Sequence, residues 1–264
     1  MRRVRLHLLV TLLVSFVFLA ICAVPVSSQS NGASEQGCAG ISSQTPVPVL
    51  ESSGDALRQQ KAYSQALTCY GIALRKDRSN VVLLNKAGIA KLQMSDLDGA
   101  QAYFERAIKQ DRKYAEARNN LGVVAYLRRN YKEAVKQYQR ALALRETSAS
   151  FHSNLGTAFF VQKKMDRAIA EYVRALELDP DVLIRSYSGG VAAQISSPEE
   201  RASYSYLLAK MYGKRGDVER CLHCLQRAKE DGYKKIHDVY VDPDFATVRE
   251  DPRLVELVPP KPQQ

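Results

Sequence analysis

The sequence predicts an all-α chain whose helical hairpins stack one after another as a solenoid and end in a short helical cap. Side chains of one size class recur every 34 residues through four copies, which is the mark of an internal repeat. Within each copy the apolar side chains fall three and four residues apart, the spacing of one helix face. Two such helices with short turns fill one repeat, so each repeat is expected to be a helical hairpin.

Four columns of the repeat carry this prediction. Glycine and alanine mark the places where helices come closest, because a larger side chain would hold the helix axes apart. An aromatic side chain fills the wider gap beside them. The register places four repeats over residues 47–182. The glycine column, the two alanine columns and the aromatic column are Gly54, Gly88, Gly122 and Gly156; Ala66, Ala100, Ala134 and Ala168; Ala73, Ala107, Ala141 and Ala175; and Tyr70, Phe104, Tyr138 and Tyr172.

The fourth copy resembles the tetratricopeptide repeat, whose pattern combines a Leu-Gly pair, an aromatic, small residues and a closing proline. The matching residues are Asn154-Leu155-Gly156, Phe159, Ala168, Tyr172, Ala175 and Pro180. The resemblance implies a right-handed α-α solenoid of about five hairpins, which binds another protein instead of catalysing a reaction.

Residues 183–201 interrupt the period as an insertion. A fifth, displaced repeat follows over residues 202–235, and Cys221 stands in its alanine column. The run Ser197-Pro198-Glu199-Glu200 supplies an N-cap serine, a proline in the first helical position and a capping-box glutamate. We therefore expect the helix of this repeat to begin at Pro198.

Residues 236–264 read as a C-terminal cap and tail. Asp242-Pro243 and Asp251-Pro252 each look like an N-cap followed by the first helical residue, so two short helices are expected. A solenoid needs such an ending because its last repeat otherwise shows an apolar flank to water. Tails with these Asp-Pro motifs are similar to the C-terminal ends of bacterial exported repeat proteins.

The first 28 residues look like a targeting segment. Three arginines precede an apolar stretch, and Val26-Ser27-Ser28 offers a cleavage site. Export beyond the cytoplasm is therefore expected, as a periplasmic or secreted protein. The alternative is an uncleaved membrane anchor through residues 8–26, because the apolar stretch is long for a signal peptide. Residues 29–46 are rich in Ser, Gln, Gly and Pro, and we expect them to be a flexible linker.

The charge pattern argues against a nucleic-acid partner. The formal net charge is +10, but acidic residues are interspersed among the basic ones along the predicted helices. No single run of cations would track a phosphate backbone, so a protein or peptide partner is expected.

Four cysteines follow the leader: Cys38, Cys69, Cys221 and Cys224. The last two have the spacing of thiol oxidoreductases and zinc sites, but those redox motifs open a helix, whereas this pair lies inside a predicted one. Packing as small side chains is the main interpretation. A local disulfide between Cys221 and Cys224 is a second, and a zinc site that includes His223 is a third. A thiol-active or metal-binding protein is therefore the alternative function.

No catalytic motif accompanies these features. The sequence has no glycine-rich phosphate loop and no His-Glu-x-x-His, and His152 is a lone histidine on a predicted helix. We therefore expect a protein that is not an enzyme and holds no cofactor and no metal.

The resemblance also suggests where a partner would bind, namely the concave groove lined by the first helix of each hairpin. Its lining would be mixed apolar and amide, which suits an extended peptide or an amphipathic helix. For Tyr126 and Phe160 the alternative is packing between neighbouring first helices. Ile89, Ser150 and Asn154 occupy the positions of the family's carboxylate clamp, so that function is not carried over. The expected groove residues are Asn85, Ile89, Leu92, Asn119, Val123, Tyr126, Ser153, Thr157 and Phe160.

Overall fold

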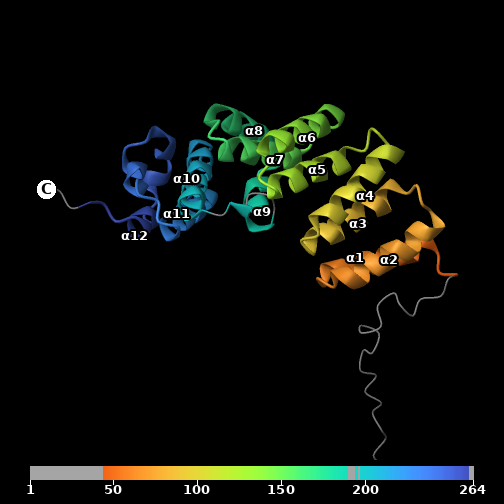
Figure 1. Ribbon diagram of the computed structural model, residues 1–264. Coiled ribbons are helices and arrows are strands. Elements are labelled where there is room, and N and C mark those ends of the chain that lie inside the picture. The colour runs from red at the N-terminus through yellow and green to blue at the C-terminus, as the bar shows by residue number, and fades with distance from the viewer. Residues whose placement is uncertain (1–43, 190–193, 196, 262–264) are drawn as a thin grey trace, which may run out of the picture. The chain divides into compact units, whose positions relative to one another are not determined.

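The computed structural model describes residues 44–189, 194–195 and 197–261 (Figure 1). Every regular element in these ranges is helical. The predicted leader, residues 1–28, and the linker up to residue 43 lie outside the described residues. Among the residues that are described, no helix is long and apolar enough to cross a bilayer.

Eight helices form four consecutive hairpins, which confirms the predicted repeat architecture. First helices of 13 residues alternate with second helices of 14. The two helices of each hairpin pack together, and each second helix also packs on the first helix of the next hairpin. The pairs are α1 Val47–Gln59 with α2 Tyr63–Lys76, α3 Val81–Gln93 with α4 Leu97–Gln110, α5 Ala115–Leu127 with α6 Tyr131–Leu144, and α7 Ala149–Val161 with α8 Met165–Leu178.

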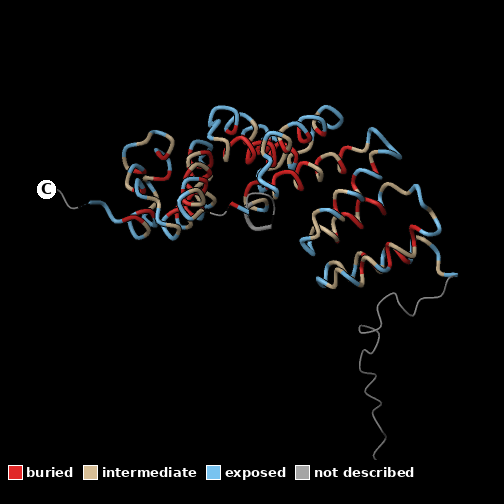
Figure 2. The backbone as a smooth tube through the Cα atoms, viewed as in Figure 1, coloured by how far each residue is buried: buried red, intermediate tan, exposed pale blue. Residues whose placement is uncertain are grey.

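The glycine and aromatic columns meet inside each hairpin. The ring of Tyr138 lies so close to Gly122 that a Cβ on the glycine would fall 2.5 Å from the ring. The same contact joins Gly156 to Tyr172 and recurs in the first two hairpins. The alanine columns are fully buried beside these rings, and buried residues follow the facing sides of the paired helices (Figure 2). Glycine is therefore required because the aromatic side chain occupies the space of its missing side chain.

The turns inside the hairpins also repeat, in a way that the sequence analysis did not predict. Lys61, Ser95, Arg129 and Lys163 stand 34 residues apart and have φ values of 63°, 61°, 60° and 59°. In each turn the next residue donates its N–H back to a carbonyl five residues earlier, as Asn130 does to Ala125 at 2.9 Å. This is a Schellman-type helix end, and it needs the left-handed backbone even though no glycine is present.

The predicted insertion begins with a helix. Val182–Gly189 forms α9, which packs against α7 and α8. It stands one repeat length after the start of α7 and so takes the place of the next first helix, cut short. The first part of the predicted insertion is therefore helical.

The fifth hairpin consists of α10 Pro198–Lys214 and α11 Val218–Glu230. As predicted, α10 begins at Pro198, and the Ser197 hydroxyl accepts the N–H of Glu200 at 3.4 Å. Its turn contains a glycine in the left-handed region, Gly216 with φ 72°.

The C-terminal cap packs on the fifth hairpin through η4 and α12. The first of the two short helices begins at Pro243 as predicted, and the Asp242 carboxylate accepts the N–H of Asp244. The element is, however, a 3-10 turn of three residues. The second start shifts by one residue, to Arg253. Phe245, Val248 and Leu254 are fully buried. The cap elements are η3 Ile236–Tyr240, η4 Pro243–Phe245, η5 Val248–Glu250 and α12 Arg253–Leu257.

Candidate binding groove

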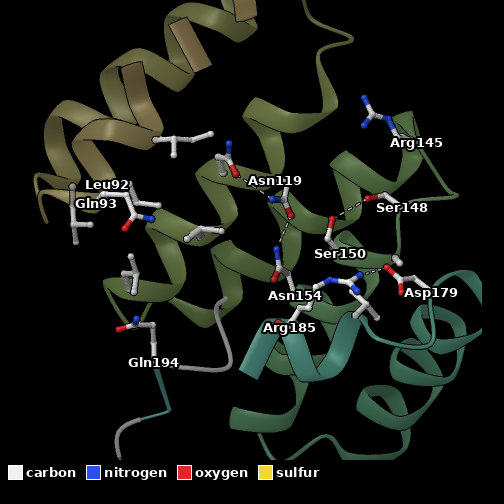
Figure 3. Close-up of a pocket in the computed structure, with 18 of the residues that line it drawn as sticks. Leu92, Gln93, Asn119, Arg145, Ser148, Ser150, Asn154, Asp179, Arg185 and Gln194 are labelled. Atoms are coloured by element: carbon white, nitrogen blue, oxygen red, sulfur yellow. Dashed lines mark hydrogen bonds and ion pairs between the residues drawn. The ribbon is translucent and has the colours of Figure 1, made fainter. Parts of the chain in front are cut away.

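The first helices of the hairpins line a groove of about 1160 Å³ (Figure 3). Side chains of α3, α5, α7 and α9 contribute to it, together with the turn between α6 and α7. We call it the binding groove. Its lining residues are Ile89, Leu92, Gln93, Ser95, Leu97, Asn119, Asn120, Val123, Leu127, Arg145, Thr147, Ser148, Ala149, Ser150, Asn154, Asp179, Val182, Arg185, Ser186 and Gln194.

A ladder of side-chain hydrogen bonds connects successive first helices with a constant spacing of 35 residues. The Nδ2 of Asn154 donates to Oδ1 of Asn119 at 3.0 Å, and Nδ2 of Asn120 donates to Oδ1 of Asn85 at 2.8 Å. Asn119 also donates to Asn120 at 3.2 Å, so the four amides form one chain from α7 to α3. We call these four residues the amide ladder. It joins α7 to α5 and α5 to α3 beside the groove.

The rung before the amide ladder is ionic. Lys86 Nζ, 35 residues after Glu51, lies 2.5 Å from the carboxylates of both Glu51 and Asp55. Burial alone would raise the pKa of Asp55, but hydrogen bonds from Lys86 and Tyr70 outweigh it and hold that pKa below its ordinary value. Ionic pairs and amide pairs can thus both join successive first helices at the spacing of 35 residues.

Four of the nine predicted groove residues line the groove: Ile89, Leu92, Asn119 and Val123. A fifth, Asn85, is 7% exposed and belongs to the amide ladder without lining the groove. These positions follow from the face of the first helix that the repeat register predicts.

Ser153 and Thr157 do not line the groove, and the prediction for them was wrong. Both are fully buried. Thr157 accepts the hydroxyl of Tyr172 at 3.2 Å and donates to the Ser153 carbonyl at 2.9 Å. In the same column, three repeats earlier, Asp55 accepts the Tyr70 hydroxyl in the same way. A polar residue in this column therefore accepts a hydrogen bond from the tyrosine hydroxyl of its own hairpin.

Tyr126 and Phe160 are also buried, at 4% and 2% exposure, and pack inside the array. Tyr126 meets Tyr131 edge to face at 5.3 Å between ring centres, and Phe160 meets Tyr204 at 5.2 Å. Burial raises the pKa of the Tyr126 hydroxyl above its ordinary range. The sequence pattern could not separate the groove face from the adjoining face because both carry apolar residues.

The sequence analysis missed the polar end of the groove. Arg145, in the turn before α7, pairs with Glu116 at 2.5 Å, and the hydroxyls of Ser148 and Ser150 lie 3.2 Å apart. Arg185 of α9 pairs with Asp179. Arg145 and Ser148 come from the turn before α7 and Arg185 comes from the predicted insertion, and the repeat columns include neither segment.

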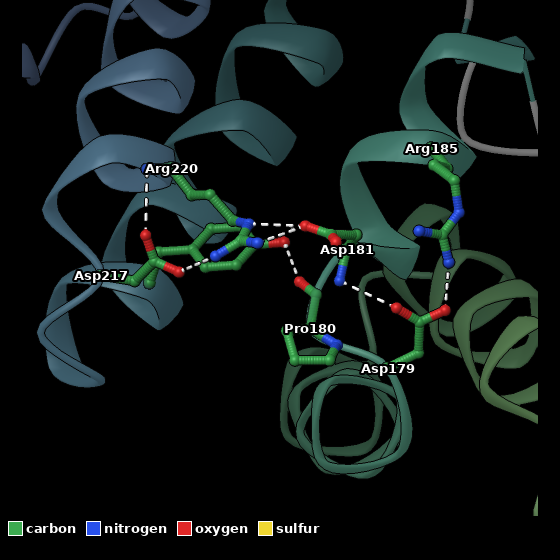
Figure 4. A network of polar contacts seen from close by, with 7 residues as sticks. Asp179, Pro180, Asp181, Arg185, Asp217 and Arg220 are labelled. Carbon is green, nitrogen blue, oxygen red and sulfur yellow. Dashed lines mark hydrogen bonds and ion pairs between the residues drawn. The ribbon is translucent and has the colours of Figure 1, made fainter.

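The groove ends beside a polar joint to the fifth hairpin (Figure 4). Arg220 Nε donates to Asp181 at 2.8 Å, and the Arg220 guanidinium also pairs with Asp217. The Tyr212 hydroxyl donates to the carbonyl of Pro180 at 3.1 Å. The residues around the closing proline thus anchor α10 and α11 to the end of the fourth repeat.

Cys221 and Cys224 are free and buried in α11, so the predicted alternative of a disulfide between them is wrong. Burial raises the pKa of both thiols, that of Cys224 to about 12. A reactive thiol needs the opposite shift. The pair packs as small side chains in the core of the fifth hairpin. Cys69, in contrast, is disulfide-bonded.

The His152 side chain connects neighbouring elements of the fold. It is 8% exposed, its Nδ1 lies 2.6 Å from a carboxylate oxygen of Glu171, and its Nε2 lies 2.9 Å from the Glu146 carbonyl. The ring therefore connects α7 to α8 and to the preceding turn. In the described part of the chain, no group of three or more His, Cys, Asp or Glu residues could hold a metal ion.

Comparison with known proteins shows that part of the array is similar to a known repeat family. Residues 85–149 and 128–182 match the family model of the tetratricopeptide repeat. No curated protein matches the chain. The repeat assignment therefore rests on the family model and on the helical hairpins.

Several solved structures are similar to the chain. The crystal structure of MamA is 23% identical, with 69% of this chain and 95% of that chain covered and a TM-score of 0.45. YrrB, described as a TPR protein with an unusual peptide-binding site, is 20% identical, with 71% and 87% covered and a TM-score of 0.44. The first TPR of Spaghetti (RPAP3), bound to an HSP90 peptide, is 24% identical, with 47% and 93% covered and a TM-score of 0.41.

Proposed function

We propose that these tetratricopeptide repeats make the chain a non-catalytic interaction scaffold, which binds an extended peptide or a helix of a partner protein in the binding groove. Tetratricopeptide repeats generally serve as interaction scaffolds. The observation that carries the proposal is the amide ladder, because it sets regularly spaced amides along the wall of a groove that also has apolar positions.

The amide ladder leaves hydrogen-bonding capacity unused. A primary amide has two N–H donors and an oxygen with two lone pairs. Asn119 spends one donor on Asn120 and one lone pair on Asn154, so one of each remains. The backbone of an extended peptide needs such donor and acceptor pairs at regular intervals.

Apolar side chains lie beside the amide ladder. Ile89, Leu92 and Val123 line the groove from two successive first helices, and Leu127 follows Val123 by one helical turn. They offer contacts for the partner's side chains, while the amides bind its main chain. A partner with apolar residues at intervals fits this arrangement.

Site-specific photo-crosslinking tests the groove. A photo-reactive residue at Val123 should capture a partner in the native cells, whereas the same residue at Gln139, exposed on α6, should not. The variant Val123→Arg should then weaken binding of the captured partner at least about 10-fold, because it places a charge against apolar contacts. Gln139→Arg adds the same charge outside the groove and is the matched control.

Equal capture from both positions would contradict the groove proposal, as would equal loss of affinity in both variants. The alternative thiol-active function gains no support, since the pKa values of Cys221 and Cys224 are raised and the two thiols are buried.

We also propose that the protein is exported and works outside the cytoplasm, as an adaptor in envelope assembly or secretion. Two observations support export. The sequence begins with a basic and apolar segment of the targeting type. Cys69 is disulfide-bonded, and structural disulfides persist in oxidising compartments.

Mass spectrometry of the native protein tests export. We expect a mature N-terminus near residue 28 and a Cys69 peptide that becomes alkylated only after reduction. An intact Met1 in membrane fractions would instead favour the anchor over residues 8–26. A soluble chain with Met1 intact and a free Cys69 thiol would overturn the proposal.

A further inference from the structure

The positive charge of the chain is concentrated in one stretch. Residues 106–145 contain eleven Lys and Arg but three Asp and Glu, a net charge of +8, while the whole chain carries +10. This stretch runs from the end of α4 through α6. The interspersed pattern seen along the sequence therefore hides a local excess.

Part of this excess gathers on one surface. Arg118 of α5 donates from Nη2 to the carbonyl of Arg112, in the turn after α4, at 3.1 Å. Arg118 and Arg140 line a shallow surface hollow of about 450 Å³, together with Ala143 and Leu144 of α6. Lys109 lies in the last turn of α4, three residues before Arg112. We call Lys109, Arg112, Arg118, Arg140 and Leu144 the basic face.

The cations of the basic face are not neutralised. Within the described ranges, no acidic side chain forms an ion pair with Lys109, Arg112, Arg118 or Arg140. Three other cations of the stretch differ, since Arg128, Lys136 and Arg145 pair with Asp98, Glu133 and Glu116. Charges that the fold leaves unpaired are available to a partner.

An apolar side chain lies among these cations. Leu144 is 41% exposed at the rim of the hollow, although leucines elsewhere in the array, such as Leu83 and Leu84, are fully buried. Long, flexible cations around an exposed leucine form the kind of surface that lies in a membrane interface, with the charges among the headgroups and the apolar side chain below them.

We propose that the basic face docks onto the anionic phospholipid headgroups of a membrane. Base stacking on a nucleic acid would require exposed aromatic rings, and none of the residues of the basic face is aromatic. The exposed cations suit many mobile phosphates better than one fixed ligand. A chain that is exported through a membrane, or tethered to one, meets such headgroups.

Vesicle flotation of the full chain tests the proposal. Phosphatidylcholine vesicles with and without about 30 mol% phosphatidylglycerol are compared at about 0.1 M salt. We expect preferential binding to the anionic vesicles. Lys109→Gln/Arg112→Gln/Arg140→Gln should reduce that preference about 10- to 100-fold. Leu144→Ser should lower binding to the anionic vesicles by a smaller factor, about 3- to 10-fold.

The matched control is Lys214→Gln/Arg215→Gln/Lys234→Gln, which removes three exposed cations outside the basic face. It should keep the preference for anionic vesicles, and circular dichroism should show both triple variants folded. Equal loss in both triple variants would reduce the effect to net charge and overturn the proposal. Binding to polyglutamate as tight as to anionic vesicles would overturn it in favour of an acidic protein.

Discussion

The four-hairpin array and the fifth hairpin both place a glycine in the first helix, but different neighbours require it. In the array, the ring of the same hairpin lies over the glycine, as Tyr138 lies over Gly122. In the fifth hairpin, a Cβ on Gly213 would fall 2.6 Å from the Asp244 carbonyl and 3.2 Å from Phe245, both in the cap. In the array, the glycine therefore packs against a ring of its own hairpin. In the last hairpin, it packs against the cap, which follows in the chain.

The difference gives the cap a structural task. Repeats in an array bury one flank against the next repeat, and the last repeat has no such neighbour. Phe245 takes that place, fully buried and 5.5 Å from the ring of Tyr206. The cap should therefore stabilise the fifth hairpin as much as a repeat stabilises its neighbour.

The largest expected effect comes from removing the Phe245 side chain. Phe245→Ala should lower the free energy of unfolding by about 3–5 kcal/mol, because it leaves a cavity in a fully buried site. Chemical denaturation measures the loss, and hydrogen exchange should locate it in α10 and α11. Val241→Ala, at a side chain 79% exposed, should change stability by less than about 0.5 kcal/mol. Equal effects would mean that the cap does not close the fifth hairpin.

Gly122→Ala tests the corresponding contact in the array. The new methyl group would meet the Tyr138 ring at 2.5 Å, so we expect a loss of about 2–3 kcal/mol through overpacking. Gly71→Ala provides a control of opposite sign, because nothing lies within 4 Å of its Cβ. Removing a helical glycine there should raise stability by about 0.5–1 kcal/mol. Thermal melts of both variants suffice, and a neutral Gly122→Ala would disprove the close contact.

Ala134→Leu tests the alanine column between the helices of the third hairpin. Ala134 is fully buried, so the larger side chain should lower stability by about 1–3 kcal/mol. Urea denaturation gives the value. Unchanged stability would mean that α5 and α6 pack in another register.

The smallest expected effect concerns the turns. Arg129→Gly should raise the free energy of unfolding by about 0.5–1 kcal/mol, because φ is 60° and glycine adopts this conformation without strain. In the interior of α6, Lys136→Gly should instead cost about 1 kcal/mol. The array would then resemble the fifth hairpin, whose turn already contains Gly216. A loss of stability at Arg129 would show that its side chain outweighs the backbone strain.

The repeat register predicted which helix faces the groove but not which side chains reach it. Ile89, Leu92, Asn119 and Val123 line the groove as expected, whereas Tyr126 and Phe160 are buried in the packing of the array. A search for pairs at 35 residues would have found the amide ladder. Asn85 and Asn119 share one column of the 34-residue repeat, and Asn120 and Asn154 share the next, but the hydrogen bonds join residues 35 apart, from one column to the other.

The sequence by itself determined the hairpins, their number in the array and their close contacts, because these depend on local periodicity and on side-chain size at fixed intervals. Tertiary structure alone decided which parts break that period. The fold turned the start of the insertion into α9 and placed Phe245 against Gly213. Such contacts join residues whose separation in the chain follows no repeat, so only the folded chain brings them together.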